Sequence, residues 1–349
     1  MFAPSRRSLL LGGAGLAATA GLTACGSSGG GTGGSSGTGG SSTAGGGSSA
    51  GAAPATGALP ATVAHKYGST TITRAPGRIV SDGYNDHDAV LALGVVPLGL
   101  RQWIPEWKQG VGPWAVSALQ GQHPEIWADD SVPFEKIAAL APDLVLETDS
   151  GITQSDYSKL SRIAPTIAQG KGYVDYGTPW DVASLMIAEA MGRKPQMQKL
   201  VDGVNASFAA ARRAHPGFAG KTVSAMTYMG PGTYNAYASE DTRGRFLSSL
   251  GLRIAPAVDR AAGSQFYAQV SPENAGLLEA DVMLLGGYGT AGSKAAFAKD
   301  KVLQSLNVVK QGRYVFVEDV DAFMAISAST VLSLPYGIDR IVPLLAAVV

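Results

Sequence analysis

The residues best suited to chemistry are aromatic side chains and arginines that gather in two segments, and each segment follows an apolar run. The first segment, "RQWIPEWKQGVGPW" at 101–114, follows "VVPLGL" and holds three of the five tryptophans of the 349-residue chain. The second, "MGPGTYNAYASEDTRGR" at 229–245, follows "TVSAMTY" and holds two tyrosines and two arginines. Aromatic rings supply apolar contact and stacking, and guanidinium groups give planar, bidentate hydrogen bonding to oxyanions. This pattern favours a bulky, flat or aromatic ligand that carries negative charge.

Single aromatic residues follow other apolar runs in the same way. Tyr84 comes after "RIVS", and Tyr288 comes after "DVMLLG". The candidate ligand-binding residues are therefore Tyr84, Arg101, Trp103, Trp107, Tyr234, Tyr237, Arg243, Arg245 and Tyr288. Each arginine has the plainer interpretation of a surface or helix-cap ion pair. One of the tryptophans between 103 and 114 is expected to be a structural anchor.

Catalytic and metal-binding sets are poorly represented in the sequence. The four histidines are His65, His87, His123 and His215. Only His87, between Asp86 and Asp88, is placed to bind a free metal ion, and one short cluster is a weak signal. The single cysteine lies in an N-terminal segment, and no serine sits on a strand-turn-helix elbow. We expect a protein that is not an enzyme and that supplies no metal ligands of its own.

The elements that must position the candidate residues form an internal repeat. "VPFEKIAALAPDLVL" at 132–146 aligns with "VSPENAGLLEADVML" at 270–284, with five identities in fifteen positions. Both read as a short helix followed by a continuous apolar strand, which is typical of a buried parallel sheet. "GRIVS" at 77–81 and "GKTVS" at 220–224 precede them in the same order. The sequence thus predicts two similar α/β lobes, with binding residues at the carboxyl ends of the strands.

A long helix is predicted between the two copies. Thr178 and Pro179 are typical of a helix start, and Gly192 and Pro195 end that helix and begin another. The second helix carries an apolar stripe of 3.6-residue period. A helix of about 20 residues spans roughly 30 Å, long enough to join two lobes as a rigid strut.

The N-terminus has the features of an exported lipoprotein. Arg6 and Arg7 precede a short uncharged apolar run, and "LTAC" at 22–25 resembles a bacterial lipobox that ends in Cys25. The paired arginines favour Tat export, with Sec export as the alternative. Residues 26–57 are nearly all Gly, Ser, Ala and Thr, a composition typical of a flexible tether. We expect lipid on Cys25 to hold the protein at the outer side of the cell membrane.

From about residue 60 onward the chain resembles the helix-linked substrate-binding proteins of ABC importers, the family of ferric-siderophore and vitamin B12 binders. The resemblance is carried by "RIVS…DAVLALGVVPLGL", "EKIAALAPDLVL", "LSRIAPTIA", "RGRFLSSLGL" and "SASTVLSLPYGIDRIVPLL", in the family's order. It implies two α/β lobes with mainly parallel sheets, joined by a single long rigid helix, with the ligand in the cleft between them and little hinge motion. "RGRFLSSLG" and the C-terminal Ser-Leu-Pro are similar to the ferric-siderophore branch found in actinobacterial lipoproteins.

The resemblance also implies the partners. A siderophore saturates Fe(III), so no further cofactor is expected, and the siderophore class stays open among catecholate, hydroxamate, mixed and citrate types. Haem or a corrinoid is the alternative ligand in the same fold. The predicted parts are a signal peptide at 1–24, a lipidated tether at 25–57, an N-terminal lobe at 58–178, a helical linker at 179–216 and a C-terminal lobe at 217–349. We expect a monomer that delivers its ligand to an ABC permease dimer with ATPase subunits. Nucleic acid is not expected as a partner. The charges of the 27 basic and 27 acidic residues cancel, and the basic residues form no cluster in the sequence.

Glu135 and Glu273 occupy the same position in the two repeated segments, early in each short helix. The family resemblance implies that acidic residues, one on each lobe, pair with arginines of the two permease subunits. The alternative is a structural role, because a carboxylate in the first turn is stabilised by the helix dipole.

Overall fold

Two mostly parallel sheets organise the residues that the structure describes, which are 59–129, 131–232, 234–287 and 293–349 of a computed structural model. These residues belong to one compact unit, Ala52–Val349. The predictions for Cys25, for segments 1–24 and 25–57 and for Tyr288 fall outside the described residues. Within the described ranges, no helix has both the length and the apolar character that a membrane span requires.

The first lobe contains a five-stranded sheet in the order β5-β4-β3-β6-β7, with every neighbouring pair parallel. Its strands are β3 (Ile79–Ser81), β4 (Gly99–Arg101), β5 (Glu125–Trp127), β6 (Leu144–Glu147) and β7 (Thr166–Ala168). All four residues of β6 are buried, as expected for a parallel strand covered on both faces. The helices of this lobe are α1 (Asp86–Ala92), η1 (Val116–Leu119), α2 (Phe134–Ala139), α3 (Gln154–Ile163) and α4 (Trp180–Ala190). A hairpin of β1 (Ala61–His65) and β2 (Gly68–Ile72) precedes the sheet.

The second lobe contains a six-stranded sheet in the order β11-β9-β8-β12-β13, with β10 also paired to β8. Its strands are β8 (Thr222–Tyr228), β9 (Tyr234–Tyr237), β10 (Arg253–Ile254), β11 (Tyr267–Val270), β12 (Val282–Gly286) and β13 (Tyr314–Val317). Strands β10, β8, β12 and β13 are parallel, and β9 is antiparallel to both of its neighbours, β8 and β11. The repeated segments are thus equivalent in topology, because β3 pairs with β6 and β8 pairs with β12.

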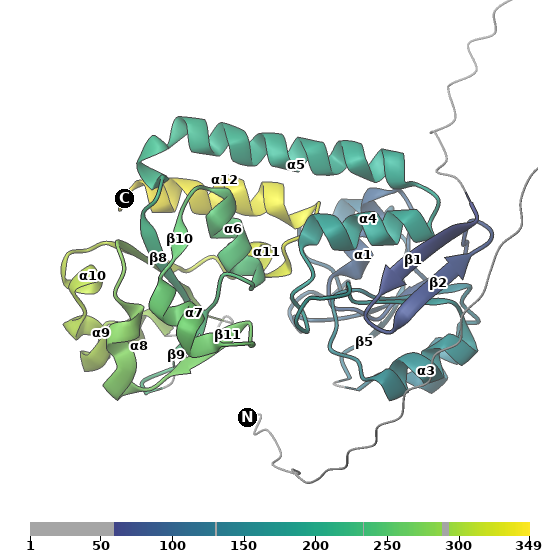
Figure 1. Cartoon of the computed structure of the whole chain (residues 1–349), viewed down its shortest axis with the longest axis horizontal. Helices are drawn as coiled ribbons and strands as arrows, with labels where there is room; N and C mark the ends of the chain where they lie inside the picture. The colour runs from purple at the N-terminus through teal and green to yellow at the C-terminus, as the bar shows by residue number, and fades with distance from the viewer. Residues whose placement is uncertain (1–58, 130, 233, 288–292) are drawn as a thin grey trace, which may run out of the picture. The chain divides into compact units, whose positions relative to one another are not determined.

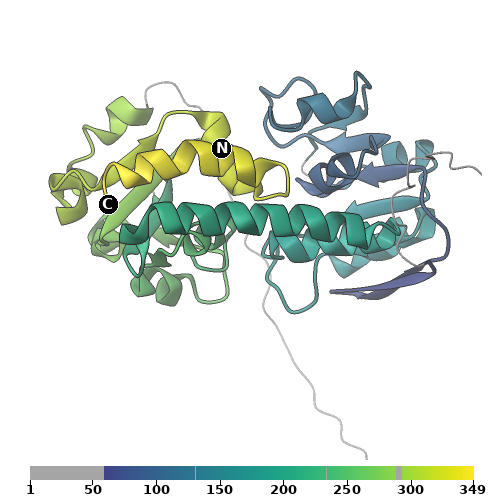
Figure 2. The ribbon, with the colours of Figure 1, turned by 90° about the horizontal axis from the view of Figure 1, so that it is seen from above.

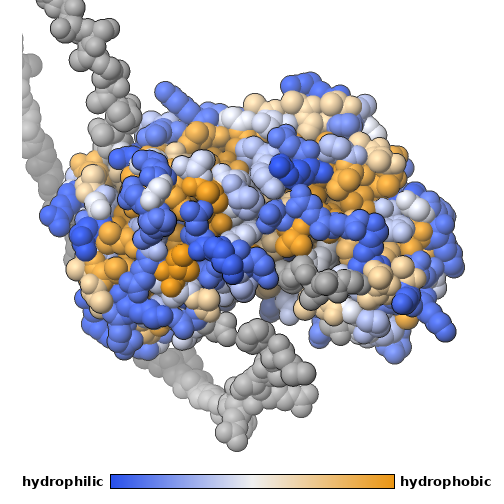
Figure 3. Space-filling view, turned by 180° about the vertical axis from the view of Figure 1, so that it is seen from behind, coloured by the Kyte–Doolittle hydropathy of each residue, from blue (hydrophilic) through white to orange (hydrophobic). Residues whose placement is uncertain are grey.

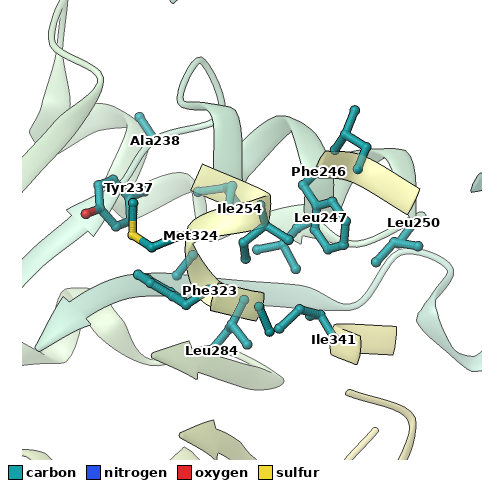
Figure 4. Close-up of a cluster of buried hydrophobic side chains, with 14 of the residues drawn as sticks. Tyr237, Ala238, Phe246, Leu247, Leu250, Ile254, Leu284, Phe323, Met324 and Ile341 are labelled. Carbon is teal, nitrogen blue, oxygen red and sulfur yellow. The ribbon is translucent and has the colours of Figure 1, made fainter. Parts of the chain in front are cut away.

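The second lobe is covered by short helices and by two longer ones at the C-terminal end. The shorter ones are η2 (Pro216–Phe218), α6 (Thr242–Ser249), α7 (Pro256–Ala262), η3 (Pro272–Leu278), α8 (Ser293–Phe297), α9 (Lys301–Ser305) and α10 (Asn307–Lys310), and the C-terminal pair is α11 (Val320–Ala328) and α12 (Ser333–Ala346). Figure 4 shows Phe323 and Met324 of α11 in one cluster with Tyr237 of β9, Leu247 of α6 and Leu284 of β12. Helix α11 is therefore part of the hydrophobic core, and all of its residues from Ala322 to Ala328 are buried.

One helix, α5 (Lys194–Ala214), runs along both lobes, as predicted for the connecting strut (Figure 1). Its buried residues, Met197, Val201, Val204 and Phe208, form the expected stripe. Figure 2 shows α12 alongside α5 on the second lobe, and the two helices are in contact. Helix α4 instead packs against α1, β1 and β7 of the first lobe. On the face opposite to that of Figure 1, hydrophobic patches on both lobes are bordered by hydrophilic residues (Figure 3).

Candidate functional site

A cavity of about 250 Å³ lies between the two lobes, and we call it the interlobe cavity. The first lobe contributes loop residues that follow β3, β4, β6 and β7, and the second contributes the end of β9 and the start of α6. The residues that line it are Tyr84, Asn85, Trp103, Asp149, Tyr176, Tyr237, Asp241, Thr242, Arg243, Phe266 and Ser327. Five of these eleven are aromatic, so the walls offer ring faces to a bulky ligand.

A second cavity of about 550 Å³, the first-lobe cavity, adjoins the interlobe cavity through Tyr84 and Tyr176, which line both. Asp82, Arg101 and Glu147 line it at the carboxyl ends of β3, β4 and β6. This is where a parallel sheet places a binding site, because the strand ends meet there.

A row of aromatic rings connects the two cavities. Tyr84 lies with its ring centroid 6.0 Å from those of Trp103 and Tyr176, and Tyr176 lies 6.2 Å from Phe266 of the second lobe. Phe266 sits just before β11, so the antiparallel ribbon of the second lobe brings it to the ring of Tyr176. Burial, together with the nearby Tyr84, raises the pKa of Tyr176 to about 12, so its hydroxyl stays protonated at neutral pH.

Arg101 is held by the loop after β3. Its Nε donates to the carbonyl oxygen of Asp82 at 2.7 Å, its Nη2 donates to Oδ1 of Asp82 at 2.8 Å, and its Nη1 donates to the carbonyl oxygen of Asp129. The guanidinium lies 5.4 Å from the ring centroid of Tyr84. Burial opposes the charged form, but the carboxylate of Asp82 outweighs it and raises the pKa of Arg101.

Glu147 adds a second carboxyl group next to Asp82. Both side chains are buried, and Oδ1 of Asp82 also accepts a hydrogen bond of 2.6 Å from Nε1 of Trp127. Burial and the negative charge of Asp82 raise the pKa of Glu147 well above its usual value. Two buried carboxyl groups beside one arginine favour a proton on one of them. Arg101 is the basic residue that interacts with both carboxyl groups.

Arg243 comes from the second lobe and has a similar environment. Asp241 caps the N-terminus of α6 by accepting from the backbone N–H of Arg243 at 2.8 Å. The same carboxylate binds the guanidinium with both oxygens, at 2.7 Å from Nε and 2.6 Å from Nη2. Nη1 donates to Oγ of Ser327 at 3.2 Å, and the guanidinium lies 3.5 Å from the ring centroid of Tyr237. Figure 4 shows that Tyr237 in turn lies beside Met324 at the edge of the core.

The next residue, Gly244, explains how the arginine can approach the sheet. A Cβ atom at Gly244 would lie 2.2 Å from the carbonyl oxygen of Ala238. Only glycine therefore fits where the start of α6 contacts the end of β9, and this close contact places Arg243 next to Tyr237.

Asp149 faces the same cavity from the first lobe. Its carboxylate accepts a hydrogen bond of 2.6 Å from the amide of Asn85. Desolvation, with a smaller contribution from the nearby Asp86, raises the pKa of Asp149 to about 7. This carboxyl group therefore keeps its proton to a much higher pH than an exposed aspartate does.

The predicted binding residues are only partly brought together. Tyr84, Trp103, Tyr237 and Arg243 line the interlobe cavity, and Arg101 lines the first-lobe cavity. Arg245 lines neither described cavity, but its guanidinium pairs with Glu240 and donates to the carbonyl oxygen of Gly177 at 3.2 Å.

Trp107 and Tyr234 do not agree with the prediction that they contact a ligand. Trp107 is buried, its Nε1 donates to Asp321 at 2.9 Å, and its ring packs edge-on against Trp114. Tyr234 is fully buried, and its hydroxyl donates to Asp300 at 3.0 Å. Both side chains are core residues whose polar atoms are satisfied by buried or half-buried carboxylates.

Several cavity residues were not identified from the sequence. They include Asp82, Glu147, Asp149, Tyr176, Asp241 and Phe266. Asp82, Glu147 and Asp149 had a usable signal, because they lie at or just after strand ends. Tyr176 and Phe266 had none, because each lies outside the aromatic-rich segments and is placed by the packing of one lobe on the other.

The remaining candidate residues concern metal binding and docking to a permease. Among the described residues, no group of three or more His, Cys, Asp or Glu could hold a metal ion. Glu135 and Glu273 are both exposed in the first turns of α2 and η3. A hydrogen bond from Ser271 lowers the pKa of Glu273, in keeping with a local structural role that need not be its only one.

Comparison with known proteins identifies a family whose model matches this chain. Residues 80–320 match the model of the family described as periplasmic binding protein. The chain is 28% identical over 202 residues to the Fe(3+) dicitrate-binding periplasmic protein FecB of Escherichia coli, which covers 56% of this chain. A second relative, the putative ABC transporter substrate-binding lipoprotein YhfQ of Bacillus subtilis, is 33% identical over 137 residues. The matches span 63% of FecB and 41% of YhfQ, less than two thirds of either relative.

Two solved structures match over nearly their whole length. A periplasmic solute binding protein of Mycobacterium smegmatis is 32% identical, with a TM-score of 0.73, and the match covers 82% of this chain and 98% of that one. PiaA of Streptococcus pneumoniae in complex with ferrichrome is 27% identical, with a TM-score of 0.72 and the same coverage.

Proposed function

Because the chain belongs to the periplasmic binding protein family, we propose that it is a lipid-anchored binding protein that captures a ferric siderophore and delivers it to an ABC importer. The observation that carries this proposal is the pair of adjoining cavities between and beside the lobes. Aromatic rings from both lobes line them, and one arginine from each lobe fixes the polar part of the wall. A cleft of this size, with aromatic walls and several fixed polar groups, suits a small bulky ligand.

The names of two relatives support iron as the cargo. FecB is named for ferric dicitrate, and PiaA was solved with ferrichrome. In both ligands the iron is already chelated, so the protein need only recognise the surface of the chelate. The aromatic row from Trp103 to Phe266 can supply that recognition without any metal ligand from the chain.

The anchor and the docking residues belong to the same proposal. Lipid on Cys25 would hold the binding unit at the membrane through the Gly/Ser-rich segment. Glu135 and Glu273 would each meet one subunit of a two-fold permease, since equivalent surfaces require equivalent partners. A monomer is sufficient, because both cavities are built from one chain.

A ligand titration of the full-length protein in detergent tests the proposal. Ferric siderophores should quench tryptophan fluorescence with saturation, because Trp103 lies in the cavity wall. Haem is the comparison ligand, and a shifted Soret band on its addition would indicate an axial ligand from the protein. Saturable binding of haem together with no response to any ferric siderophore would contradict the proposed function.

A further inference from the structure

The charges of the two cavities determine which ferric chelates they can accept. The basic residues that line them, within the described part of the chain, are Arg101, Lys159 and Arg243. The internal positions outside the described ranges carry no basic residue, because they are Asp130, Thr233 and the run Tyr-Gly-Thr-Ala-Gly at 288–292. Full positive charge for an anionic ligand must therefore come from these three side chains.

Each of the three is already paired with a carboxylate of the chain. Arg243 uses Nε and Nη2 on the two oxygens of Asp241, and Arg101 uses Nε and Nη2 on the carbonyl and carboxylate oxygens of Asp82. The Nε–Nη2 edge is one that gives bidentate recognition of an oxyanion, so an anionic ligand would have to compete with a buried carboxylate for each guanidinium. The third, Lys159, lies 3.8 Å from Asp156.

Two more carboxyl groups line the cavities without a basic partner of their own. Glu147 lies beside Asp82 in the first-lobe cavity, and Asp149 receives only the amide of Asn85 in the interlobe cavity. With both groups protonated the cavity walls are neutral, and each ionisation adds a negative charge. The walls are therefore neutral to acidic at every protonation state of these two groups.

Siderophore classes differ in the charge that they leave on iron. A hydroxamate carries one negative charge, so three of them neutralise Fe(III) and give an uncharged or, with a free amine, a cationic chelate. A catecholate carries two, and citrate carries extra carboxylates, so their ferric chelates are polyanions. A polyanion in a low-dielectric cavity that already holds carboxylates is repelled, whereas a neutral chelate can use the aromatic walls without that cost.

We propose that the cleft selects uncharged or cationic ferric chelates of the trihydroxamate type and discriminates against polyanionic citrate and catecholate chelates. This inference rests on the proposed function, and it reverses the expectation of an anionic ligand that the arginines alone suggest. The arginines are present in the cavity walls, but their charges are used within the chain.

Four probes at pH 7.5 test the selection in the full-length protein in detergent. These are ferrichrome (uncharged), ferrioxamine B (cationic), ferric dicitrate and ferric enterobactin (both anionic). At least one of the first two should bind about 100-fold more tightly than either anionic chelate. An anionic chelate that binds as tightly as the best of the first two would overturn the selection and leave the proposed function standing. If no ferric chelate binds, the selection and the proposed function both fail.

A variant with an altered charge in the interlobe cavity tests whether cavity charge causes the selection. Asp241→Asn keeps a residue that caps helices well but removes the carboxylate from Arg243, so the cavity gains one positive charge. The ratio of anionic to uncharged chelate affinity should rise about tenfold. Glu125→Gln is the matched control, because it removes one charge at the exposed start of β5, lines neither cavity and should leave the ratio unchanged.

Asp156→Asn keeps the test decisive if Asp241→Asn unfolds. Asp156 is partly exposed in the first turn of α3, and asparagine there still presents an amide oxygen to the cap of Thr153. The substitution removes the carboxylate that pairs with Lys159 in the first-lobe cavity. The ratio of anionic to uncharged chelate affinity should therefore rise, as it should for Asp241→Asn. An unchanged ratio in every folded variant would show that cavity charge does not govern selection.

Discussion

Thr330 donates a hydrogen bond of 2.5 Å to Oδ2 of Asp88, a residue 242 positions earlier in the chain. Asp88 lies in α1 of the first lobe, and Thr330 lies between α11 and α12 of the second. Nε1 of Trp114 donates to the same oxygen at 2.7 Å, and Nε1 of Trp107 donates to Asp321 across the same boundary. The lobes are thus tied together independently of α5, in agreement with a binding protein whose lobes move little.

Thr330→Val should destabilise the protein by about 1–3 kcal/mol. The valine has nearly the same shape but leaves the buried Asp88 carboxylate with one hydrogen-bond donor fewer. Urea unfolding measures the change. Thr62→Val is the control, because Thr62 pairs with Thr71 on an exposed hairpin and should cost much less. Equal losses in the two variants would show that the Asp88 contact is not special.

Trp103→Ala and Trp107→Ala should have opposite consequences although the residues are four positions apart. Trp103 is half-buried in the interlobe cavity, so its loss should weaken ligand binding by about 1–3 kcal/mol and hardly change the melting temperature. Trp107 is buried in the core, so its loss should cost roughly 3–5 kcal/mol of unfolding free energy. Titration and thermal melting on both variants separate the roles, and a stable Trp107→Ala protein with lost binding would reverse them.

Asp149 should make the ligand-free protein less stable as the pH rises. Its pKa is about 7 in the folded protein and near 3.8 in the unfolded chain, so the folded state binds more protons between these values. The free energy of unfolding therefore falls as the pH rises from about 4 to 7, by roughly 4 kcal/mol, because a difference of one pKa unit corresponds to about 1.4 kcal/mol. Asp149→Asn should remove this dependence and be more stable than the parent at pH 8.

Urea unfolding of the parent and of Asp149→Asn at pH 4, 6 and 8 checks the direction of this pH dependence. The gap between variant and parent should widen with pH and be smallest at pH 4. A gap that narrows with rising pH would mean that the ionised carboxylate stabilises the fold.

Glu135→Arg combined with Glu273→Arg should abolish siderophore uptake by cells while ligand affinity and melting temperature stay unchanged. Both residues are exposed and neither lines a cavity, although Phe134, next to Glu135, does line the first-lobe cavity. Exposed charges at a rim act mainly on docking. Glu125→Arg is the control for charge reversal alone. Normal uptake by the double variant would remove the glutamates from docking, and a large loss of stability would favour their structural role.

The fold could be predicted because its signals are local and repeated. The apolar strands, the repeat at 132–146 and 270–284 and the stripe of α5 each lie within a few turns of chain. The binding residues were harder, since burial depends on distant partners: Trp107 is fixed by Asp321, 214 residues away, and Tyr234 by Asp300. The net charge of the binding site was the hardest property to predict from the sequence. Arg101 is paired with Asp82 only because β3 and β4 lie side by side in the folded protein.

The central claim is that a ferric siderophore binds between the lobes, and locating the iron tests it most directly. Crystals grown with a saturating ferric trihydroxamate, measured at the iron absorption edge, give an anomalous difference map. We predict one strong iron peak in the space bounded by Tyr84, Tyr176 and Tyr237, with aromatic rings around the chelate. Saturated crystals whose iron peak lies elsewhere on the protein would contradict the account.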